Sequence, residues 1–194
     1  ETGRFEDVKL LITGHNDVNG SNGNDNNNMT LKEYVNQVGK DDRGDEYTPL
    51  MLATDQAIID YLFSILLDGV TLNTNTLTDV YKEAFPDGTP IVCACQLGRF
   101  EDVKLLITGH KDVNSSNGNN NNMTLKEYVN QVGKKSDGYN MTPLTIAAQN
   151  KHQEIVDYLV DIAYADETEL VRKYKKEFPK GTPIVCACEK GRFE

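Results

Sequence analysis

Four cysteines are the residues of this sequence best suited to chemistry, and they form two Cys-Ala-Cys triplets, Cys93/Cys95 and Cys186/Cys188. A structural zinc site usually takes cysteine pairs spaced by two to four residues, and it needs four ligands. Residues i and i+2 of a helix point about 200° apart, so neither triplet is suited to chelate a metal. A secreted disulfide scaffold would be shorter and richer in cysteine. We therefore predict buried, reduced thiols, no metal, no cofactor and an intracellular (cytoplasmic) protein.

The other candidates for chemistry are a loop and three histidines. The segment Asp17–Asn28 alternates polar residues as a calcium loop does, but that motif requires glycine at its sixth place and glutamate at its twelfth. These places hold Asn22 and Asn28, so we predict an Asn-rich loop in solvent. The three histidines, among them His152, stand beside no nucleophile or carboxylate in a catalytic arrangement. We predict no enzyme. The remaining histidines are His15 and His110.

Asn-x-Ser/Thr triplets offer a different setting for the protein. Such triplets accept N-linked sugars when a protein is secreted. A proline, Pro143, directly follows the triplet at Asn140 and makes that context unfavourable. Secretion with N-linked glycans is therefore the alternative to an intracellular setting, with four candidate sites: Asn19, Asn28, Asn114 and Asn122.

The composition excludes two classes of partner. The 194 residues include 30 acidic and 20 basic ones, which gives a net charge of −10. A surface that binds nucleic acid neutralises phosphates with Lys and Arg, and this chain has no dense basic patch. No apolar run approaches the roughly 20 residues that a membrane helix needs. We predict neither a nucleic-acid partner nor a membrane partner.

Repeated text indicates which elements position these residues. The blocks Gly3–Lys40 and Gly98–Lys134 are nearly the same, with GRFEDVKLLITGH and MTLKEYVNQVGK identical in both. A Thr hydroxyl can cap a helix N-terminus, and proline suits the first helical position. Four Thr-Pro pairs therefore predict four short helices, at Thr48-Pro49, Thr89-Pro90, Thr142-Pro143 and Thr182-Pro183.

A second helix is predicted after each opening. In RFEDVKLLITGH the apolar residues recur at helical spacing, and Gly109 is expected to end the helix. The segment HQEIVDYLVDIA repeats the pattern with Ile155, Leu159 and Ile162. Two short helices joined by a tight turn cannot bury their own apolar face, whereas stacked hairpins bury it.

An additional helix is predicted after each hairpin. Thr124–Gly133 begins with the capping-box pair Thr124 and Glu127, and Thr30–Gly39 is its twin. In TLTDVYKEAF and TELVRKYKKEF, apolar residues recur at i, i+4 and i+8, which is typical of a helix with one buried face. These residues are Leu77, Tyr81 and Phe85, and Leu170, Tyr174 and Phe178.

The stretch GTPIVCACQLGRFEDVKLLITGHKDVN resembles an ankyrin repeat, whose pattern has Thr-Pro, a later Ala and Gly, Val-x-x-Leu-Leu and a final Asp-Val-Asn. Matching positions include Thr89, Pro90, Ala94, Gly98 and Val103. GYNMTPLTIAAQNKHQEIVDYLVDIAYAD is similar, and its His152 matches the family's histidine at the turn between helices, which the resemblance implies bonds to backbone. The segment that opens at Thr48 matches less well because it is about three residues shorter between its helices. The openings lie 41, 53 and 40 residues apart, against about 33 in the family.

The resemblance implies an all-α, ankyrin-like helical-repeat solenoid, with alternating long and short units and an additional helix after each hairpin. An armadillo-like solenoid is the alternative fold. We expect one solenoid over residues 1–194: a first long unit at 1–87 that lacks its first helix, a second at 88–180 and the start of a third at 181–194. The chain begins at a second helix and ends after a first helix, so we interpret it as an excerpt of a longer array.

The resemblance also implies a non-enzymatic scaffold for protein–protein interaction. The segments Asp41–Asp87 and Lys135–Lys180 differ between the two copies, while the blocks before them hardly differ. Recognition residues are expected in the varied segments, although recent recombination of one half explains the contrast equally well. A structural protein that assembles with copies of itself, head to tail into a filament, is the alternative. The candidate partner-binding residues are Met51, Asp55, Gln56, Thr145, Gln149 and Lys151.

Overall fold

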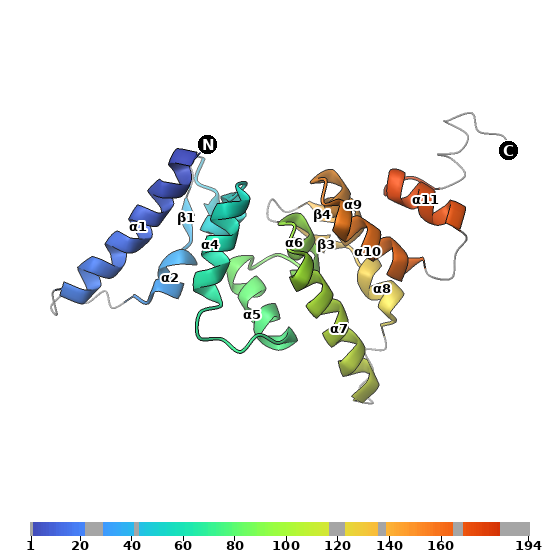
Figure 1. The fold of residues 1–194 in the computed structure, drawn as a ribbon, viewed down its shortest axis with the longest axis horizontal. Helices are drawn as coiled ribbons and strands as arrows, with labels where there is room; N and C mark the ends of the chain where they lie inside the picture. Colours follow the sequence, from blue (N-terminus) through green and yellow to red (C-terminus); the bar gives the residue numbers. More distant parts are fainter. Residues whose placement is uncertain are drawn as a thin grey trace. The chain divides into compact units, whose positions relative to one another are not determined.

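A computed structural model describes residues 2–21, 29–40, 43–116, 123–135, 139–164 and 169–182. The chain is mostly helical, as Figure 1 shows, with eleven helices and two short antiparallel strand pairs in these ranges. The predicted all-α fold is confirmed. Two compact units are present: unit 1 comprises Glu1–Leu72 and Glu83–Pro86, and unit 2 comprises Asn73–Lys82 and Asp87–Glu194. The predicted single solenoid and its boundaries stay predictions.

Unit 1 contains six elements in chain order. They are α1 (Thr2–Ser21), α2 (Leu31–Val35), β1 (Gly39–Lys40), β2 (Glu46–Tyr47), α3 (Pro49–Leu52) and α4 (Gln56–Leu66). The strands pair antiparallel, with Gly39 opposite Tyr47. Helix α4 packs on α1 and α2 and buries Ile59, Leu62 and Phe63.

Unit 2 is built largely of repeated versions of the same elements. They are α6 (Pro90–Gln96), α7 (Phe100–Ser116), α8 (Leu125–Asn130), β3 (Gly133–Lys134), β4 (Asn140–Met141), α9 (Pro143–Gln149), α10 (Gln153–Ala163) and α11 (Glu169–Glu177). Helix α5 (Thr74–Ala84) contributes its residues up to Lys82. Helices α6 and α9 pack side by side, and each packs on the second helix of its own hairpin, α7 and α10 (Figure 1). This is the stacking that short amphipathic hairpins need.

The duplication is visible in equivalent contacts. In unit 1 the ring of Phe5 meets Tyr61 edge to face at 5.9 Å, and in unit 2 the ring of Phe100 meets Tyr158 in the same way at 5.5 Å. Helix α1 therefore corresponds to α7, and α4 corresponds to α10. Repeated sequence likewise makes α2, β1 and α3 the counterparts of α8, β3 and α9, each shifted by 94 residues. Helix α3 has 4 residues where α9 has 7, whereas the connections to α4 and α10 are equally long. The prediction that the shortening lies between the two helices is therefore wrong, because it lies within the first helix.

Several of the predicted helix boundaries are wrong. The helix predicted to end at Gly109 continues to Ser116, and α1 likewise continues through Gly14 to Ser21, so the first residues of the expected Asp17–Asn28 loop are helical. Gly109 does not end the helix. It makes room for a neighbour instead, because a Cβ atom there would lie 1.9 Å from the hydroxyl oxygen of Thr74. The remainder of that loop lies outside the described residues.

The additional helices Thr30–Gly39 and Thr124–Gly133 are shorter than predicted, since they end at Val35 and Asn130. Their last residues turn into β1 and β3, whose strand pairs the sequence did not indicate. The predicted capping boxes are confirmed. In each, a Thr hydroxyl accepts the backbone N–H of a Glu three residues later, and that carboxylate accepts the Thr backbone N–H at 2.7 Å.

The Thr-Pro openings behave in two ways. The hydroxyls of Thr48 and Thr142 accept the backbone N–H three residues later, as predicted. Thr89 makes no such cap. Its backbone N–H donates to the carbonyl of Lys134 at 3.2 Å, and its side chain lies against Gly133. The described residues end at Thr182, so the helix predicted to start at Thr182-Pro183 lies outside them.

Candidate partner-binding surface

Three of the six predicted partner-binding residues lie around one groove of unit 2. The groove has a volume of about 570 Å³ and is lined from α9 by Thr145 and Gln149, and from the turn after α9 by Lys151. The side chains of Gln149 and Lys151 are exposed, and Thr145 is half-buried. Helix α9 and the turn after it therefore present polar groups to one concavity.

The opposite wall of this groove comes from α11 and the residues after it. Phe178 provides an apolar side chain, and Lys176 and Lys180 provide ammonium groups. Lys176 is held toward α10 by Asp157, with 3.1 Å between the ammonium nitrogen and a carboxylate oxygen. The basic run KYKKEFPK was a sequence signal for this wall, but nothing in the spacing of its residues showed that it faces α9.

The turn between α9 and α10 is fixed by two side chains that share one acceptor. Asn150 Nδ2 donates to the carbonyl oxygen of Gln96 at 2.7 Å, and His152 Nε2 donates to the same oxygen at 3.1 Å. The predicted backbone contact of His152 is thereby confirmed. Because Gln96 ends α6, this contact ties the turn that carries Lys151 to the previous hairpin. The wall of the groove is positioned by stacking rather than by local propensity.

Lys151 has an unusual backbone at this turn, with φ of 62°. In the preceding hairpin the equivalent place is Gly98, with φ of 71°. Left-handed backbone costs roughly 1–2 kcal/mol for a residue with a Cβ atom. The chain thus holds a lysine at a position where its own earlier repeat uses glycine.

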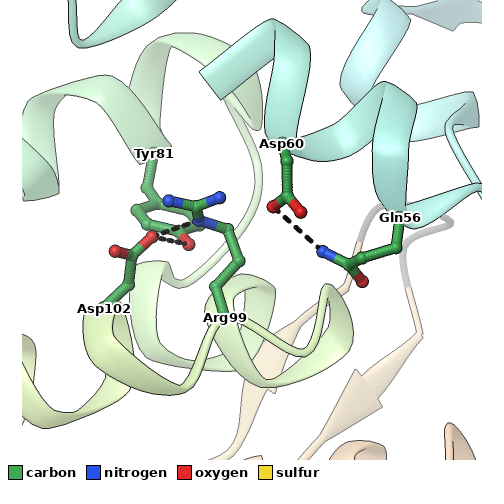
Figure 2. Close-up of polar contacts among 5 residues, drawn as sticks. All are labelled: Gln56, Asp60, Tyr81, Arg99 and Asp102. Atoms are coloured by element: carbon green, nitrogen blue, oxygen red, sulfur yellow. Dashed lines mark hydrogen bonds and ion pairs between the residues drawn. The ribbon is translucent and has the colours of Figure 1, made fainter. Parts of the chain in front are cut away.

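In unit 1 the other three candidate residues have structural contacts. The carboxylate of Asp55 caps α4 by accepting the backbone N–H groups of Ala57 and Ile58. Met51 Sδ accepts the backbone N–H of Thr48 at 3.3 Å. The amide of Gln56, which is exposed, donates to Asp60 at 3.2 Å (Figure 2). The structure does not bring these three residues into the groove of unit 2, and their role in binding stays a prediction.

A buried polar cluster in unit 2 was not recognised from the sequence. Asp102, only 4 % exposed, accepts the phenol O–H of Tyr81 at 2.8 Å and the guanidinium N–H of Arg99 at 2.5 Å (Figure 2). Burial, and then the charge of Asp102, raise the pKa of Tyr81 well above its ordinary value. This cluster ties α5 to the start of α7 and offers no open site for a substrate.

The two cysteines of the first triplet lie on α6, are fully buried and form no disulfide. Burial raises the pKa of Cys93 to about 12, and burial raises the pKa of Cys95 as well. Such thiols are poor nucleophiles at neutral pH because the thiolate is the reactive form. In the described ranges no group of three His, Cys, Asp or Glu side chains could hold a metal ion. Cys186 and Cys188 lie outside these ranges.

The candidate glycosylation sites fall where side chains are not described. Asn19 and Asn114 lie in the last turns of α1 and α7, and Asn28 and Asn122 lie outside the described residues. Among the described helices, none combines the length and the apolar character that crossing a membrane requires.

Comparison with known proteins agrees with the hairpin geometry. The family model described as "Ankyrin repeats (3 copies)" matches residues 78–169, which contain both the α6–α7 and the α9–α10 hairpins. Searches of curated proteins and of solved structures found no match to the chain. Ankyrin repeats generally mediate protein–protein interaction and are generally not enzymes. Residues 78–169 are therefore similar to ankyrin repeats, both in sequence and in the packing of their helix hairpins.

Proposed function

We propose that this protein is a non-enzymatic scaffold that binds a partner protein through the groove of unit 2. The observation that carries the proposal is the convergence of Thr145, Gln149 and Lys151 on one concavity. These residues come from α9, the first helix of its hairpin, and from the turn after it. Those positions vary between the two copies of the repeat, while the blocks before them are nearly constant.

The chemistry of the groove favours an acidic partner segment with an apolar residue. Three lysines and one acidic residue line it in a chain whose net charge is −10: Lys151, Lys176, Lys180 and Glu177. Opposite charges across an interface raise the association rate and select the partner. Phe178 offers an aromatic side chain, and aromatic residues are enriched at protein–protein interfaces. A carboxylate next to an apolar side chain is the group that this arrangement would take.

Capture from a cell extract, with matched variants, tests the proposal. The variant Lys151→Glu with Gln149→Ala changes the groove, while Lys82→Glu changes an exposed lysine of α5 that does not line it. We expect the wild type and Lys82→Glu to retain the same bound proteins, and the groove variant to lose them. Equal retention by all three chains would contradict the proposal, and so would recovery of the chain alone.

An intracellular setting is part of the proposal, and the unpaired thiols of Cys93 and Cys95 are compatible with it. Secretion with glycans is the alternative. Treatment of the protein from its native source with an N-glycosidase would leave its mass unchanged in the first case and lower it in the second.

A further inference from the structure

The turn after α9 contains the one non-glycine residue of the described chain with positive φ. This residue is Lys151, whose φ is 62°. The turn ends the helix in the usual way, because the backbone N–H of His152 donates to the carbonyl oxygen of Ala147 at 2.9 Å. Such helix ends usually have glycine in the left-handed position, since a Cβ atom makes that backbone unfavourable. The backbone alone thus disfavours lysine here.

The preceding hairpin makes the same turn with glycine. Helix α6 ends at Gln96, the φ of Gly98 is 71°, and the backbone N–H of Arg99 donates to the carbonyl oxygen of Ala94 at 3.1 Å. Gly98 and Lys151 are therefore equivalent, and the turn itself does not require a lysine. The reason for a lysine at this position has to lie in its side chain.

The side chain of Lys151 has no structural contact that explains its presence. It is exposed, and within the described residues its ammonium group forms no hydrogen bond or ion pair. Residues with unfavourable backbone cluster at functional sites, where another requirement retains them. The strained backbone of Lys151 thus favours a contact with a ligand over a role in the fold.

The lysines that line the groove of unit 2 differ in how much of their charge is already neutralised. The ammonium nitrogen of Lys176 lies 3.1 Å from a carboxylate oxygen of Asp157 and 3.9 Å from one of Asp161. Lys151 has no carboxylate within ion-pair distance among the described residues. On the α9 side of the groove, Lys151 therefore supplies a cation that is available to a ligand.

The turn holds Lys151 in place before any partner arrives. On either side of it, Asn150 and His152 donate to the carbonyl oxygen of Gln96, at 2.7 Å and 3.1 Å. A residue whose backbone is fixed in this way loses less conformational freedom on binding, which lowers the cost of association. The position of Lys151 is thus preorganised, and only its side chain has to become ordered.

We propose that Lys151 is the residue that selects an acidic side chain of the partner in the groove of unit 2. This inference rests on the proposed function and names the residue that determines its charge specificity. A carboxylate of the partner accepts a hydrogen bond from the Lys151 ammonium group, and charge-assisted bonds of this kind are stronger than neutral ones. A neighbouring apolar side chain of the partner contacts Ala148 and Phe178, which line the same groove.

Selection from a displayed library of random peptides tests this charge specificity. The full chain is used as wild type, as Lys151→Glu and as the matched control Lys82→Glu, which changes an exposed lysine outside the groove. We expect the wild type and Lys82→Glu to enrich peptides with an acidic residue beside an apolar one. Lys151→Glu should enrich peptides with a basic residue at the same place, because a reversed charge on the groove repels the original ligand.

A second variant separates binding from folding. Lys151→Gly removes both the ammonium group and the unfavourable backbone, so its urea midpoint should rise while its binding weakens. We expect the dissociation constant for a peptide enriched by the wild type to increase about tenfold. A side chain that merely stabilised the turn would instead lower the urea midpoint when it is removed.

The possible failures can be told apart. The same peptides enriched by the wild type and by Lys151→Glu would overturn this inference and leave the proposed function standing. So would a selected charge that inverts in Lys180→Glu but not in Lys151→Glu, or a Lys151→Gly chain that binds the peptide as tightly as the wild type. A wild-type chain that enriches no peptide would contradict the proposed function, and this inference with it.

Discussion

At the scale of single residues, the repeats provide their own reference for what each position needs. Gly98 and Lys151 occupy equivalent turns, and both have left-handed backbone, with φ of 71° and 62°. The glycine is required twice over, because a Cβ atom there would lie 2.6 Å from the imidazole of His152. The lysine has no such requirement and retains a backbone that glycine would adopt at lower cost.

The variant Lys151→Gly should therefore stabilise the protein by about 1 kcal/mol, the left-handed cost less the backbone entropy of glycine. Urea unfolding followed by circular dichroism would measure the change. The reciprocal variant Gly98→Ala should destabilise, because it adds both a strained backbone and a contact with His152. A destabilised Lys151→Gly would mean that the side chain of Lys151 contributes more than its backbone costs.

The cluster around Asp102 gives a second prediction for individual residues. Tyr81→Phe removes one hydrogen bond but leaves Arg99 beside the carboxylate, so it should cost about 1 kcal/mol of the free energy of unfolding. Asp102→Ala leaves a buried phenol and a mostly buried guanidinium without their acceptor, and should cost about 3 kcal/mol or more. Chemical denaturation of both variants would check the ranking. Equal losses would show that Arg99 does not depend on Asp102.

At the scale of secondary-structure elements, the distance between helices depends on where glycine stands. Gly109 in α7 lets Thr74 at the start of α5 approach closely enough for its hydroxyl to donate to the carbonyl of Leu105 at 3.3 Å. Gly14 is the twin of Gly109 in α1, and nothing lies within 4 Å of its would-be Cβ atom. One sequence position is thus a packing requirement in one copy and open in the other.

Gly109→Ala should destabilise the protein by about 1–3 kcal/mol through overpacking against Thr74, although alanine favours helix. Gly14→Ala has only the helical preference and should stabilise by up to about 1 kcal/mol. Thermal unfolding of the two variants in parallel would decide. If both glycines respond alike, the close approach of α5 to α7 is not what Gly109 provides.

The sequence predicted these elements to different degrees. Thr-Pro openings, capping boxes and apolar spacing located the helices because each depends on local chemistry that the text displays. The end of α7 was predicted wrongly because glycine often ends a helix, whereas Gly109 serves the close packing of Thr74 against α7. The groove wall formed by Phe178 was missed because α11 packs on α10, and only the tertiary structure brings it to the same groove as α9.

At the scale of the whole molecule, burial of titratable groups makes stability depend on alkaline pH. Burial raises the pKa of Cys93 and of Tyr128 to about 12, and it raises the pKa values of Cys95 and Tyr81 as well. In the unfolded chain these groups ionise near their ordinary values, about 8.5 for cysteine and about 10 for tyrosine. The unfolded state therefore loses protons first as pH rises.

The free energy of unfolding should accordingly be at its plateau below about pH 8.5 and fall between about pH 9 and 12. Cys93→Ala removes one of these groups, so its slope above pH 9 should be shallower by up to about 1.4 kcal/mol per pH unit. Urea denaturation at a series of pH values would measure both slopes. Parallel slopes would mean that Cys93 is not enclosed in the folded state.

The duplicated sequence blocks also have a consequence for how the chain reaches its native state. The sequence blocks on which α6 packs occur twice and nearly unchanged, and the segment GTPIVCAC also occurs twice. Pairings are therefore possible that satisfy every local contact and yet connect the wrong segments. Natural sequences usually avoid such degeneracy, because competing minima slow the search. In this chain the competing pairings follow directly from the repeated sequence. A chain in which Gly88–Cys95 packs on α1 instead of α7 is the misfolded species that these repeats make possible.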